Sequence, residues 1–546
     1  MSSNIQKMIV TCALPYSNNS LHLGHMLEHI QADIWVRYQK MQKHKVFFIC
    51  ADDAHGTPIM LQAKKFKKTP EEIIQKIKIE HQKDLSDFHI HYDNYHTTHS
   101  KENKKLLILI YRRLKQNGFI KSRIIYQFYD IKENIFLPDR FIKGNCPKCK
   151  ANNQYGDNCE ICGATYNPTD LVNPKSTISN SIPIIKKSKH LFFDLPYFSN
   201  MLHTWINSGT LQKEIVNKTK EWIQLGLQEW NISRDSPYFG FKIPNVLNKY
   251  FYVWLDAPIG YMGTFQNLCN KKDNIVFDDF WKTNSVHGLY HFIGKDIIYF
   301  HTLFWPAILE GSKFRKPTNI FVHGHLMVNG QKMSKSRGTF IKTRDYLQYL
   351  DADCLRYYYA SKLSSNIKDI NFDTENFVKK INTDIVNKIV NLASRNASFI
   401  HKYFQGYLSN KILHQELYHI FIYAKKDIEN AFHIRETNKV IQKVIFLVNL
   451  ANQYINQQAP WSISEKKEKN KKLHNICSMG IHLFYIIMIY LKPILPSLAN
   501  KVETFLNTSL SWENIQKPLL SHKIRPFRIL FKRIQINEVN NIFYKK

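Results

Sequence analysis

The pattern of apolar and polar residues at the start of the chain predicts alternating strands and helices. Met8 to Ala13 is a short, apolar, β-branched run that ends before Pro15, which predicts a buried strand. From Leu23 onward the apolar residues recur at helical spacing, and Ser20 stands where an N-cap is expected. Val46 to Cys50 predicts a second strand. This order is typical of the opening of a parallel, nucleotide-binding α/β sheet.

The junction between the first strand and the helix contains the sequence His22-Leu-Gly24-His25. A helix N-terminus carries backbone N–H groups without intrahelical partners and the positive end of the helix dipole, so it favours an anion. Gly24 adds no side chain that would block a ligand. The motif therefore predicts a polyphosphate cradle, although two ordinary histidines at a helix start would give the same four residues.

Residues that follow the predicted strands are expected to meet at one edge of the sheet, where α/β proteins bind ligands. This places Tyr16 and Asp53 beside the two histidines, although Asp53 could instead cap the following helix. The stretch from Tyr250 to Gly263 predicts an aromatic-rich strand that runs into Ala257-Pro258. Core packing is the alternative explanation for these aromatic residues.

A second motif, Lys332-Met-Ser-Lys335-Ser336, lies far downstream between Gly330 and Gly338. The glycines allow a hinge, and two lysines with two hydroxyls can engage a polyphosphate. A solvated basic turn would be the default for such a run. Together, however, the His-x-Gly-His turn and this loop resemble the signature pair of class I aminoacyl-tRNA synthetases. The surrounding residues are similar to methionyl-tRNA synthetases over essentially the whole chain.

The resemblance implies ATP-dependent attachment of methionine to its tRNA through methionyl-adenylate, with Mg²⁺ accompanying ATP. It also implies a role for residues at matching positions. The catalytic residues would be His22, His25 and Lys335. ATP would contact Gly24, Gly294, Asp296, Lys332, Ser334 and Lys335. Methionine would contact Leu14, Tyr16, Asp53, Arg234, Trp254, Ala257, Pro258, Tyr261, Ile297 and His301.

Four of the nine cysteines form two Cys-x-x-Cys turns, Cys146 with Cys149 and Cys159 with Cys162. Two close pairs of thiolates match a tetrahedral zinc site, and a site with only protein ligands is typically structural. Two disulfides or a redox pair are the alternatives, which a reducing cytoplasm and the polar loop disfavour. The resemblance implies that this insertion helps to position the acceptor end of tRNA. The other cysteines are expected to be reduced core thiols.

From Glu375 onward the sequence predicts helices almost to the end of the chain. Ile385, Ile389 and Leu392 mark the buried stripe of one long amphipathic helix. Asn391 and Arg395 are one turn apart outside this stripe and are expected to be exposed, and Pro460-Trp461 begins a loop after another helix. Single-stranded RNA is bound by stacking on aromatic rings and by polar contacts to base edges. The resemblance assigns Asn391, Arg395, Pro460 and Trp461 to reading the methionine anticodon.

The expected fold is α/β, with a Rossmann-like parallel nucleotide-binding sheet interrupted by a zinc-bearing connective insertion and followed by an α-helical bundle domain. The catalytic domain is expected at 1–116 and 232–325, and the insertion at 117–231 with its zinc knuckle at about 143–165. The Lys-Met-Ser-Lys-Ser loop and a linking region would occupy 326–374. A helical anticodon-binding domain would occupy 375–546.

Composition changes this picture only slightly. The net charge of +32 suits a nucleic-acid partner, although a bias toward Lys, Asn and Ile codons could supply part of it. The N-terminus lacks the layout of a signal peptide, and the most apolar late stretch, Leu483 to Leu491, is too short to span a bilayer. We therefore expect a cytoplasmic protein without a membrane partner. A monomer is expected, because some relatives dimerise through an appended tRNA-binding barrel and this chain ends soon after its helical third.

Two other classes of function remain open at this stage. A small-molecule nucleotidyltransferase could share the histidine cradle but would not need the helical third. A non-catalytic zinc-bearing RNA-binding protein would not need both ATP motifs. Among the synthetases, the cysteinyl enzyme is the nearest rival, but its zinc sits in the amino-acid pocket. The isoleucine, leucine and valine enzymes carry a large editing insertion for which this chain has no room.

Overall fold

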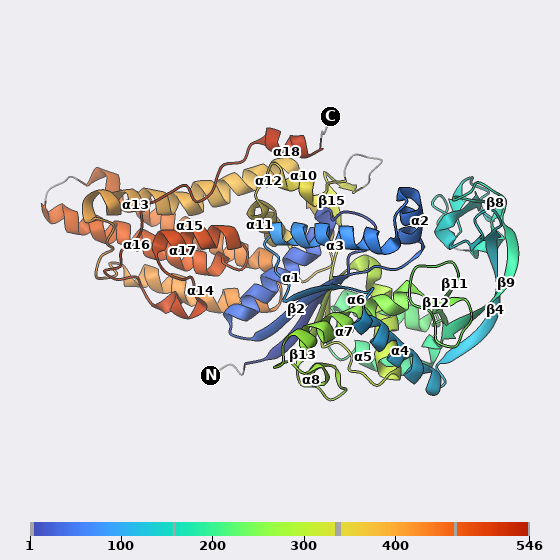
Figure 1. The fold of residues 1–546 in the computed structure, drawn as a ribbon. Coiled ribbons are helices and arrows are strands. Elements are labelled where there is room, and N and C mark those ends of the chain that lie inside the picture. The colour runs from blue at the N-terminus through green and yellow to red at the C-terminus, as the bar shows by residue number, and fades with distance from the viewer. Residues whose placement is uncertain (1–4, 157–158, 165, 334–339, 464–466, 544–546) are drawn as a thin grey trace.

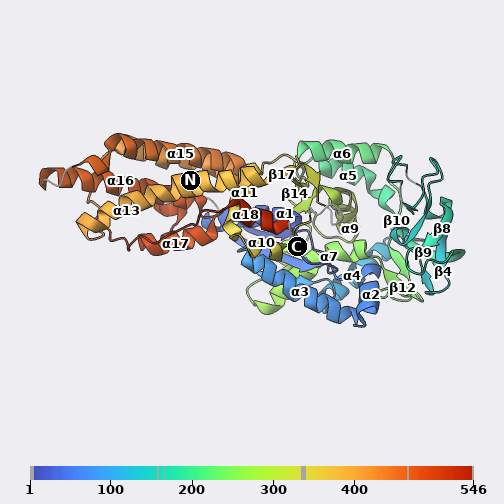
Figure 2. The same ribbon diagram turned by 90° about the horizontal axis from the view of Figure 1, so that it is seen from above.

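The computed structural model describes residues 5–156, 159–164, 166–333, 340–463 and 467–543. The molecule is elongated, with an α/β body between a strand-rich insertion at one end and a bundle of helices at the other (Figures 1 and 2). The N-terminal part of the chain enters the α/β body, and the last helix, α18 (Ile536–Phe543), lies back along α12 (Thr374–Lys380) near that body. The chain therefore passes through the bundle and returns.

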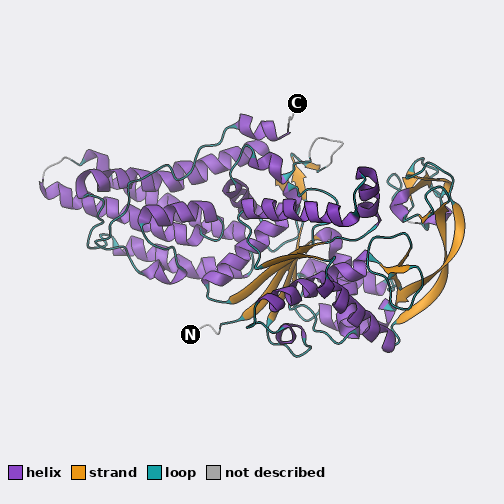
Figure 3. Ribbon diagram, in the orientation of Figure 1, coloured by secondary structure: helices purple, strands orange, loops and turns teal. Residues whose placement is uncertain are grey.

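A five-stranded sheet in the order β14-β13-β1-β2-β3 forms the centre of the α/β body, and all of its strand pairs are parallel. Its strands are β1 (Lys7–Cys12), β2 (Lys45–Asp52), β3 (Asn94–Thr97), β13 (Gly288–Gly294) and β14 (Asn319–His323). Helices α1 (Leu23–Met41), α4 (Lys101–Gln116) and α7 (Val253–Lys271) pack around it (Figure 3). The predicted fold class is confirmed, and both predicted N-terminal strands are present.

Two local predictions were wrong. Helix α1 is capped by His22 rather than by Ser20, because the imidazole Nδ1 of His22 accepts the N–H of Gly24 at 3.1 Å. The aromatic stretch after Tyr250 is not one strand: β12 covers only Lys249–Phe251, and Trp254 lies in the first turn of α7. Tyr252, the extended N-cap residue of α7, separates the two, and Trp254 lines the cavity described below.

The insertion is built on a long antiparallel pair of strands, β4 (Ile120–Asp130) and β9 (Ile184–Phe193). This pair curves away from the α/β body and carries a small three-stranded sheet at its far end (Figure 1). The small sheet consists of β6 (Ile142–Asn145), β7 (Gln154–Tyr155) and β8 (Val172–Ser176). A separate apolar core that includes Phe128 and Ile142 holds this end together.

A second small sheet joins the α/β body to the helices. It contains β15 (Leu326–Val328), β16 (Gln331–Lys332) and β17 (Ile370–Phe372), and α10 (Thr343–Leu347) and α11 (Ala352–Lys362) lie between them in sequence. One long helical run then follows through α12, a π-helical segment (Ile381–Val390) and α13 (Asn391–Phe404). The remaining bundle helices are α14 (Gln415–His433), α15 (Thr437–Gln458), α16 (Lys467–Leu491) and α17 (Pro496–Leu506).

The predicted apolar stripe of the long helix is confirmed, since Ile385, Ile389 and Leu392 are buried. Within α16, the segment Lys471–Leu491 is long and apolar enough to cross a membrane by length and composition. The apolar stretch is therefore longer than the expected Leu483 to Leu491. However, 94% of its most apolar window is buried inside the protein. The segment therefore serves as the central core helix of the bundle.

Arg356 of α11 joins the α/β body to the bundle. Its guanidinium is fully buried, forms an ion pair with Asp33 of α1 at 2.6 Å, and donates to the carbonyls of Phe88 and Ile494. A buried charge is tolerated only when it is paired and hydrogen-bonded, and this one meets both conditions. One apolar core continues across this junction from α1 into the helices of the bundle.

Candidate functional site

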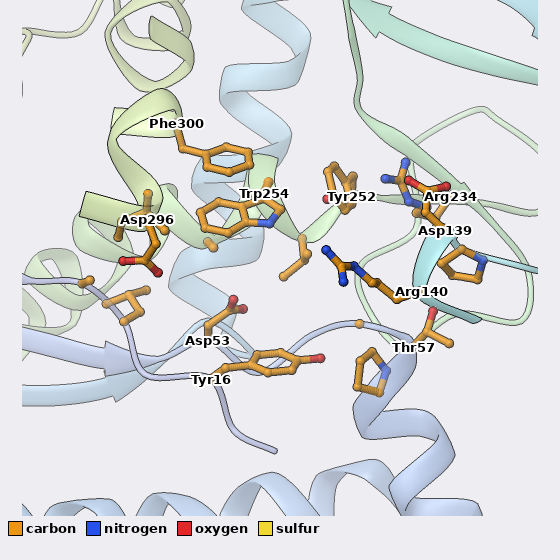
Figure 4. A pocket seen from close by; sticks show the side chains of 18 of the residues that line it. Tyr16, Asp53, Thr57, Asp139, Arg140, Arg234, Tyr252, Trp254, Asp296 and Phe300 are labelled. Carbon is orange, nitrogen blue, oxygen red and sulfur yellow. The ribbon is translucent and has the colours of Figure 1, made fainter. Parts of the chain in front are cut away.

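A cavity of about 1290 Å³ opens at the carboxyl edge of the central sheet, between the sheet and the insertion (Figure 4). Every described residue that was predicted to act in catalysis or to contact methionine or ATP lines it. Those residues are Leu14, Tyr16, His22, Gly24, His25, Asp53, Arg234, Trp254, Ala257, Pro258, Tyr261, Gly294, Asp296, Ile297, His301 and Lys332. Ser334, Lys335 and Ser336 lie outside the described residues. The cavity therefore brings the assigned residues together, while their roles stay predictions.

Asp53 follows β2 and lies between the ring of Tyr16 and the indole of Trp254 (Figure 4). Its backbone is fixed, because its N–H donates to the carbonyl of Pro15 at 2.8 Å and its carbonyl accepts the N–H of Ser17 at 2.8 Å. Its Oδ1 is buried and has no hydrogen-bond partner among the residues that the structure describes. Burial, and then the nearby charge of Asp256, raise the pKa of this carboxyl well above its usual range. The arrangement favours a cationic ligand that would supply the missing partner.

The loop that carries Asp53 is held on both sides by buried histidine–aspartate pairs. On one side, Asp52 accepts from Nδ1 of His81 at 2.7 Å. On the other, His55 and Asp256 of α7 form a pair at 2.7 Å. The two pairs therefore hold the backbone on both sides of Asp53 in place.

Aromatic rings form the wall opposite Asp53. The indole of Trp254 stacks on Phe300, with ring centroids 3.6 Å apart and an interplanar angle of 9°. Nδ1 of His301 must donate to the carbonyl of Ile297 at 3.1 Å, so its Nε2 accepts the hydroxyl proton of Tyr261 at 2.9 Å. Burial lowers the pKa of His301 to about 4, which keeps it neutral. The wall is thus apolar, with two neutral polar groups, and suits an uncharged, polarisable side chain.

Several lining residues were not identified from the sequence. Arg140 reaches into the cavity from the insertion, and Tyr252 stacks on the guanidinium of Arg234 at 3.6 Å (Figure 4). Glu28 accepts the N–H of Ala13 at 2.5 Å and lies 3.4 Å from Nε2 of His323. The aromatic run at 250–254 contained a usable signal for Tyr252. Arg140 and Glu28 had none, since one lies in a short 3₁₀ helix and the other on a helix whose remaining buried residues are mostly apolar.

The two motif histidines are neutral N–H donors. The N–H of His22 donates to Nδ1 of His25 at 3.2 Å, and the N–H of Gly24 donates to Nδ1 of His22. Each Nδ1 therefore accepts, which assigns the ring proton to Nε2. Burial, followed by the neighbouring His22, lowers the pKa of His25 well below its usual value. The prediction that free backbone N–H groups bind the anion was wrong, because the N–H of Leu23 is also taken, by the carbonyl of Ile341 at 3.1 Å.

The segment that follows the second motif lies beside the first motif. His22 and Lys342 form an antiparallel bridge, and the N–H of Thr343 donates to the carbonyl of Leu21 at 3.1 Å. Gly24 leaves room for its neighbours here, since a Cβ would lie 2.9 Å from both Cε1 of His22 and Cε of Met333 and would displace these two side chains. Gly294 is similar, because a Cβ there would lie 2.5 Å from a carboxylate oxygen of Asp296.

The four clustered cysteines converge at the far end of the insertion. The Sγ atoms of Cys146 and Cys162 are 3.8 Å apart, and those of Cys149 and Cys159 are 3.6 Å apart. These distances are too long for a disulfide, whose S–S bond is about 2.05 Å. They match the edge of a tetrahedron with metal–sulfur bonds of about 2.3 Å. The N–H groups of Cys149 and Cys162 each donate to the first sulfur of their own turn at 3.4 Å, which stabilises thiolates.

A groove of about 640 Å³ on the bundle is lined by two of the four predicted RNA-binding residues. Asn391 and Arg395 line it, although both are half-buried rather than fully exposed. The guanidinium of Arg395 lies 4.7 Å from the ring centre of Trp461 and donates to Asn456 at 3.3 Å. Trp461 is 52% exposed, and Pro460 is buried beneath it in the same short 3₁₀ turn.

Comparisons with known proteins agree with this geometry. Residues 8–397 match the family described as "tRNA synthetases class I (M)". A structure of Mycobacterium tuberculosis methionyl-tRNA synthetase in complex with methionyl-adenylate aligns with a TM-score of 0.80 and 22% identity, over 96% of this chain and 100% of that one. A ligand-free structure of the same enzyme aligns with a TM-score of 0.73 and 21% identity, over 97% and 99%. At these identities the solved structures establish the likeness of fold.

Because its ionised form is unfavourable in the folded protein, Asp53 is expected to lower the free energy of unfolding. In Asp53→Asn we expect the free energy of unfolding of the ligand-free protein to rise by about 0.5–2 kcal/mol at neutral pH. Because the folded-state pKa exceeds the unfolded value of about 3.9, the gain should appear as the pH rises above that value and vanish at lower pH. Urea denaturation at pH values below and above this unfolded pKa measures the gain in the free energy of unfolding. The matched variant Asp52→Asn breaks a buried pair and should instead destabilise, so equal losses in both variants would contradict the account.

Proposed function

We propose that this chain, which belongs to the class I tRNA synthetases of type M, divides its reaction among the cavity, the insertion and the groove. The protein attaches methionine to its tRNA in an ATP-dependent reaction that passes through methionyl-adenylate and releases pyrophosphate and AMP. One observation carries the assignment of the cavity. The unpaired carboxyl oxygen of Asp53 faces an apolar aromatic wall, and the two donor histidines lie in the same cavity.

In this proposal methionine binds with its ammonium group on Asp53. Its thioether side chain lies against the wall formed by Trp254, Ala257, Pro258 and Tyr261. Sulfur–aromatic contacts contribute about 0.3–1.5 kcal/mol each. The hydroxyl of Tyr261 is committed to neutral His301, so the wall carries no charge that would favour an acidic or basic side chain.

The first step is attack of the methionine carboxylate on the α-phosphorus of ATP, and it depends on positioning and charge stabilisation. The Nε2–H groups of His22 and His25 would donate to the phosphates as negative charge moves onto pyrophosphate. Lys332 and Lys335 would supply positive charge from the second motif, and Gly294 and Asp296 would contact the adenosine. Mg²⁺ bound with ATP would neutralise part of the phosphate charge.

We assign a structural Zn²⁺ to the four-cysteine cluster. The cluster's distances and its four thiolate donors fit zinc, and all four ligands come from the protein. The zinc-bearing sheet follows Arg140 directly in sequence, so an ordered cluster would keep this arginine aimed into the cavity. The insertion would thereby help to place the tRNA acceptor end.

We assign the groove on the bundle to the methionine anticodon. A half-exposed indole with a guanidinium on its face offers a stacking surface, and the amides around it offer donors and acceptors for base edges. We further propose a cytoplasmic monomer. Light scattering would test the oligomeric state.

The experiment that tests this function is pyrophosphate exchange into ATP, run with each amino acid separately. We expect methionine to support exchange and homocysteine, which lacks the methyl group on sulfur, to do so roughly 10- to 200-fold less efficiently. Asp53→Asn should lose methionine-dependent exchange because the ammonium group loses its counter-charge. Exchange that does not depend on an amino acid would indicate a small-molecule nucleotidyltransferase, and a complete absence of exchange would favour a non-catalytic RNA-binding protein.

We expect about one zinc per chain. The variant Cys159→Ala should lose the metal and expose reactive thiols on the remaining three cysteines, as measured by elemental analysis and thiol titration. Cys269→Ala, which removes a half-buried thiol outside the cluster, should retain the metal. Purified protein without zinc, with all four clustered thiols freely titratable, would refute the assignment.

We expect Trp461→Ala to weaken tRNA aminoacylation by about 1–3 kcal/mol, or roughly 5- to 150-fold in kcat/KM, through the loss of base stacking. Methionine-dependent pyrophosphate exchange should be nearly unchanged, since the groove lies on the bundle. Tyr423→Ala removes a 73% exposed aromatic ring on α14 and should change neither activity. A parallel loss of both activities in Trp461→Ala would mean that Trp461 stabilises the bundle and does not read the anticodon.

A further inference from the structure

Helix α3 (Pro70–Asp87) contacts the loop before the first motif and the segment after the second motif, although none of its residues belongs to either motif. Its residue His81 bonds to the loop before His22, and its residue Asp84 bonds to the segment that follows the Lys332–Ser336 motif. Both side chains are fully buried. They are three positions apart and so lie on one face of the helix.

His81 donates from both ring nitrogens. Its Nε2 lies 2.8 Å from the carbonyl oxygen of Asn19, and its Nδ1 lies 2.7 Å from Oδ1 of Asp52. A carbonyl and an ionised carboxylate can only accept, so both nitrogens carry protons and the ring is an imidazolium. Burial alone would lower the pKa of His81, but the hydrogen bond to Asp52, the charge of Asp52 and the hydrogen bond to Asn19 together outweigh burial and raise the pKa. The loop that leads to His22 is therefore held by a charge-assisted bond from α3.

Asp84 holds the facing segment. Its carboxylate accepts from the hydroxyl of Thr343 and from Nε of Arg344. The backbone N–H of Thr343 donates in turn to the carbonyl of Leu21, next to His22. Asp87, one turn later and 42% exposed, pairs with the same guanidinium from the helix surface. Asp84 therefore adds a buried contact to Thr343 that Asp87 does not make.

We propose that His81 and Asp84 are positioning residues for the adenylation step, which together fix the N-cap of α1 so that His22 and His25 point at the ATP phosphates. The proposal rests on the phosphate role given above to these two histidines. Neither residue lines the cavity, so each acts through the backbone that it holds. Asp84 makes no hydrogen bond to the loop of Asp53 within the described part of the chain, so its effect should spare methionine binding.

The test compares Asp84→Asn with the matched control Asp87→Asn in the full-length protein. We expect Asp84→Asn to lower the kcat of methionine-dependent pyrophosphate exchange at least tenfold, while the methionine dissociation constant, followed by tryptophan fluorescence, changes less than twofold. Asp87→Asn should change neither quantity. Thr343→Val removes the same contact with a side chain of equal shape and should reproduce the effect of Asp84→Asn. It therefore serves as the test if Asp84→Asn fails to fold.

A double-mutant cycle separates positioning from general stability. In a background that carries His22→Ala and His25→Ala, Asp84→Asn should cause less than a twofold further loss of the residual rate, since the groups that it positions are gone. A full additional tenfold loss, or equal losses of rate and methionine affinity in Asp84→Asn, would overturn the proposal. An unchanged rate in Thr343→Val would also overturn it. Absence of exchange in the unmodified protein would instead refute the proposed function itself.

Discussion

The structure depends most on a buried carboxylate without an internal counter-charge. Ionised Asp53 is unfavourable at the end of β2, because burial and the charge of Asp256 both oppose it and its Oδ1 lacks a partner in the described part of the chain. The protein keeps the group in place with two buried histidine–aspartate pairs, one on each side of the loop. A ligand with a positive charge would stabilise the ionised carboxylate and so bind favourably. An amino acid carries such a charge on its ammonium group.

The wall that would face the amino-acid side chain is uncharged, whereas charged residues such as Arg140, Arg234 and Asp296 line other parts of the cavity. His25 and His301 are held neutral by burial, so they donate or orient hydrogen bonds without repelling or attracting an amino-acid side chain. The parallel sheet brings Asp53 and the histidine turn to the same edge although they lie on different strands. Selection of an uncharged side chain and activation by a charged nucleotide can then take place in one cavity.

Much of this arrangement could be predicted from the sequence, because it follows local patterns. The short apolar runs predicted β1 and β2, and the paired Cys-x-x-Cys turns predicted the sulfur cluster. Helical spacing of apolar residues predicted the buried stripe of the long helical run from α12 to α13. Contacts between distant segments could not be predicted. The N–H of Leu23 is taken by Ile341, and Asp84 bonds to Thr343, more than 250 positions away. The cap at His22 was missed because an imidazole is an uncommon N-cap and Ser20 fits the usual preference.

Proton release on methionine binding is the most direct test of the central claim that Asp53 is the ammonium's counter-charge. Methionine is titrated calorimetrically into the ligand-free protein between about pH 5 and 8, in buffers of different ionisation enthalpy. The account predicts that binding lowers the raised pKa of Asp53 and so releases a proton over the lower part of this range, and that Asp53→Asn removes both the release and most of the affinity. Equal methionine affinity in Asp53→Asn, with no proton release at any pH in the wild-type protein, would contradict it.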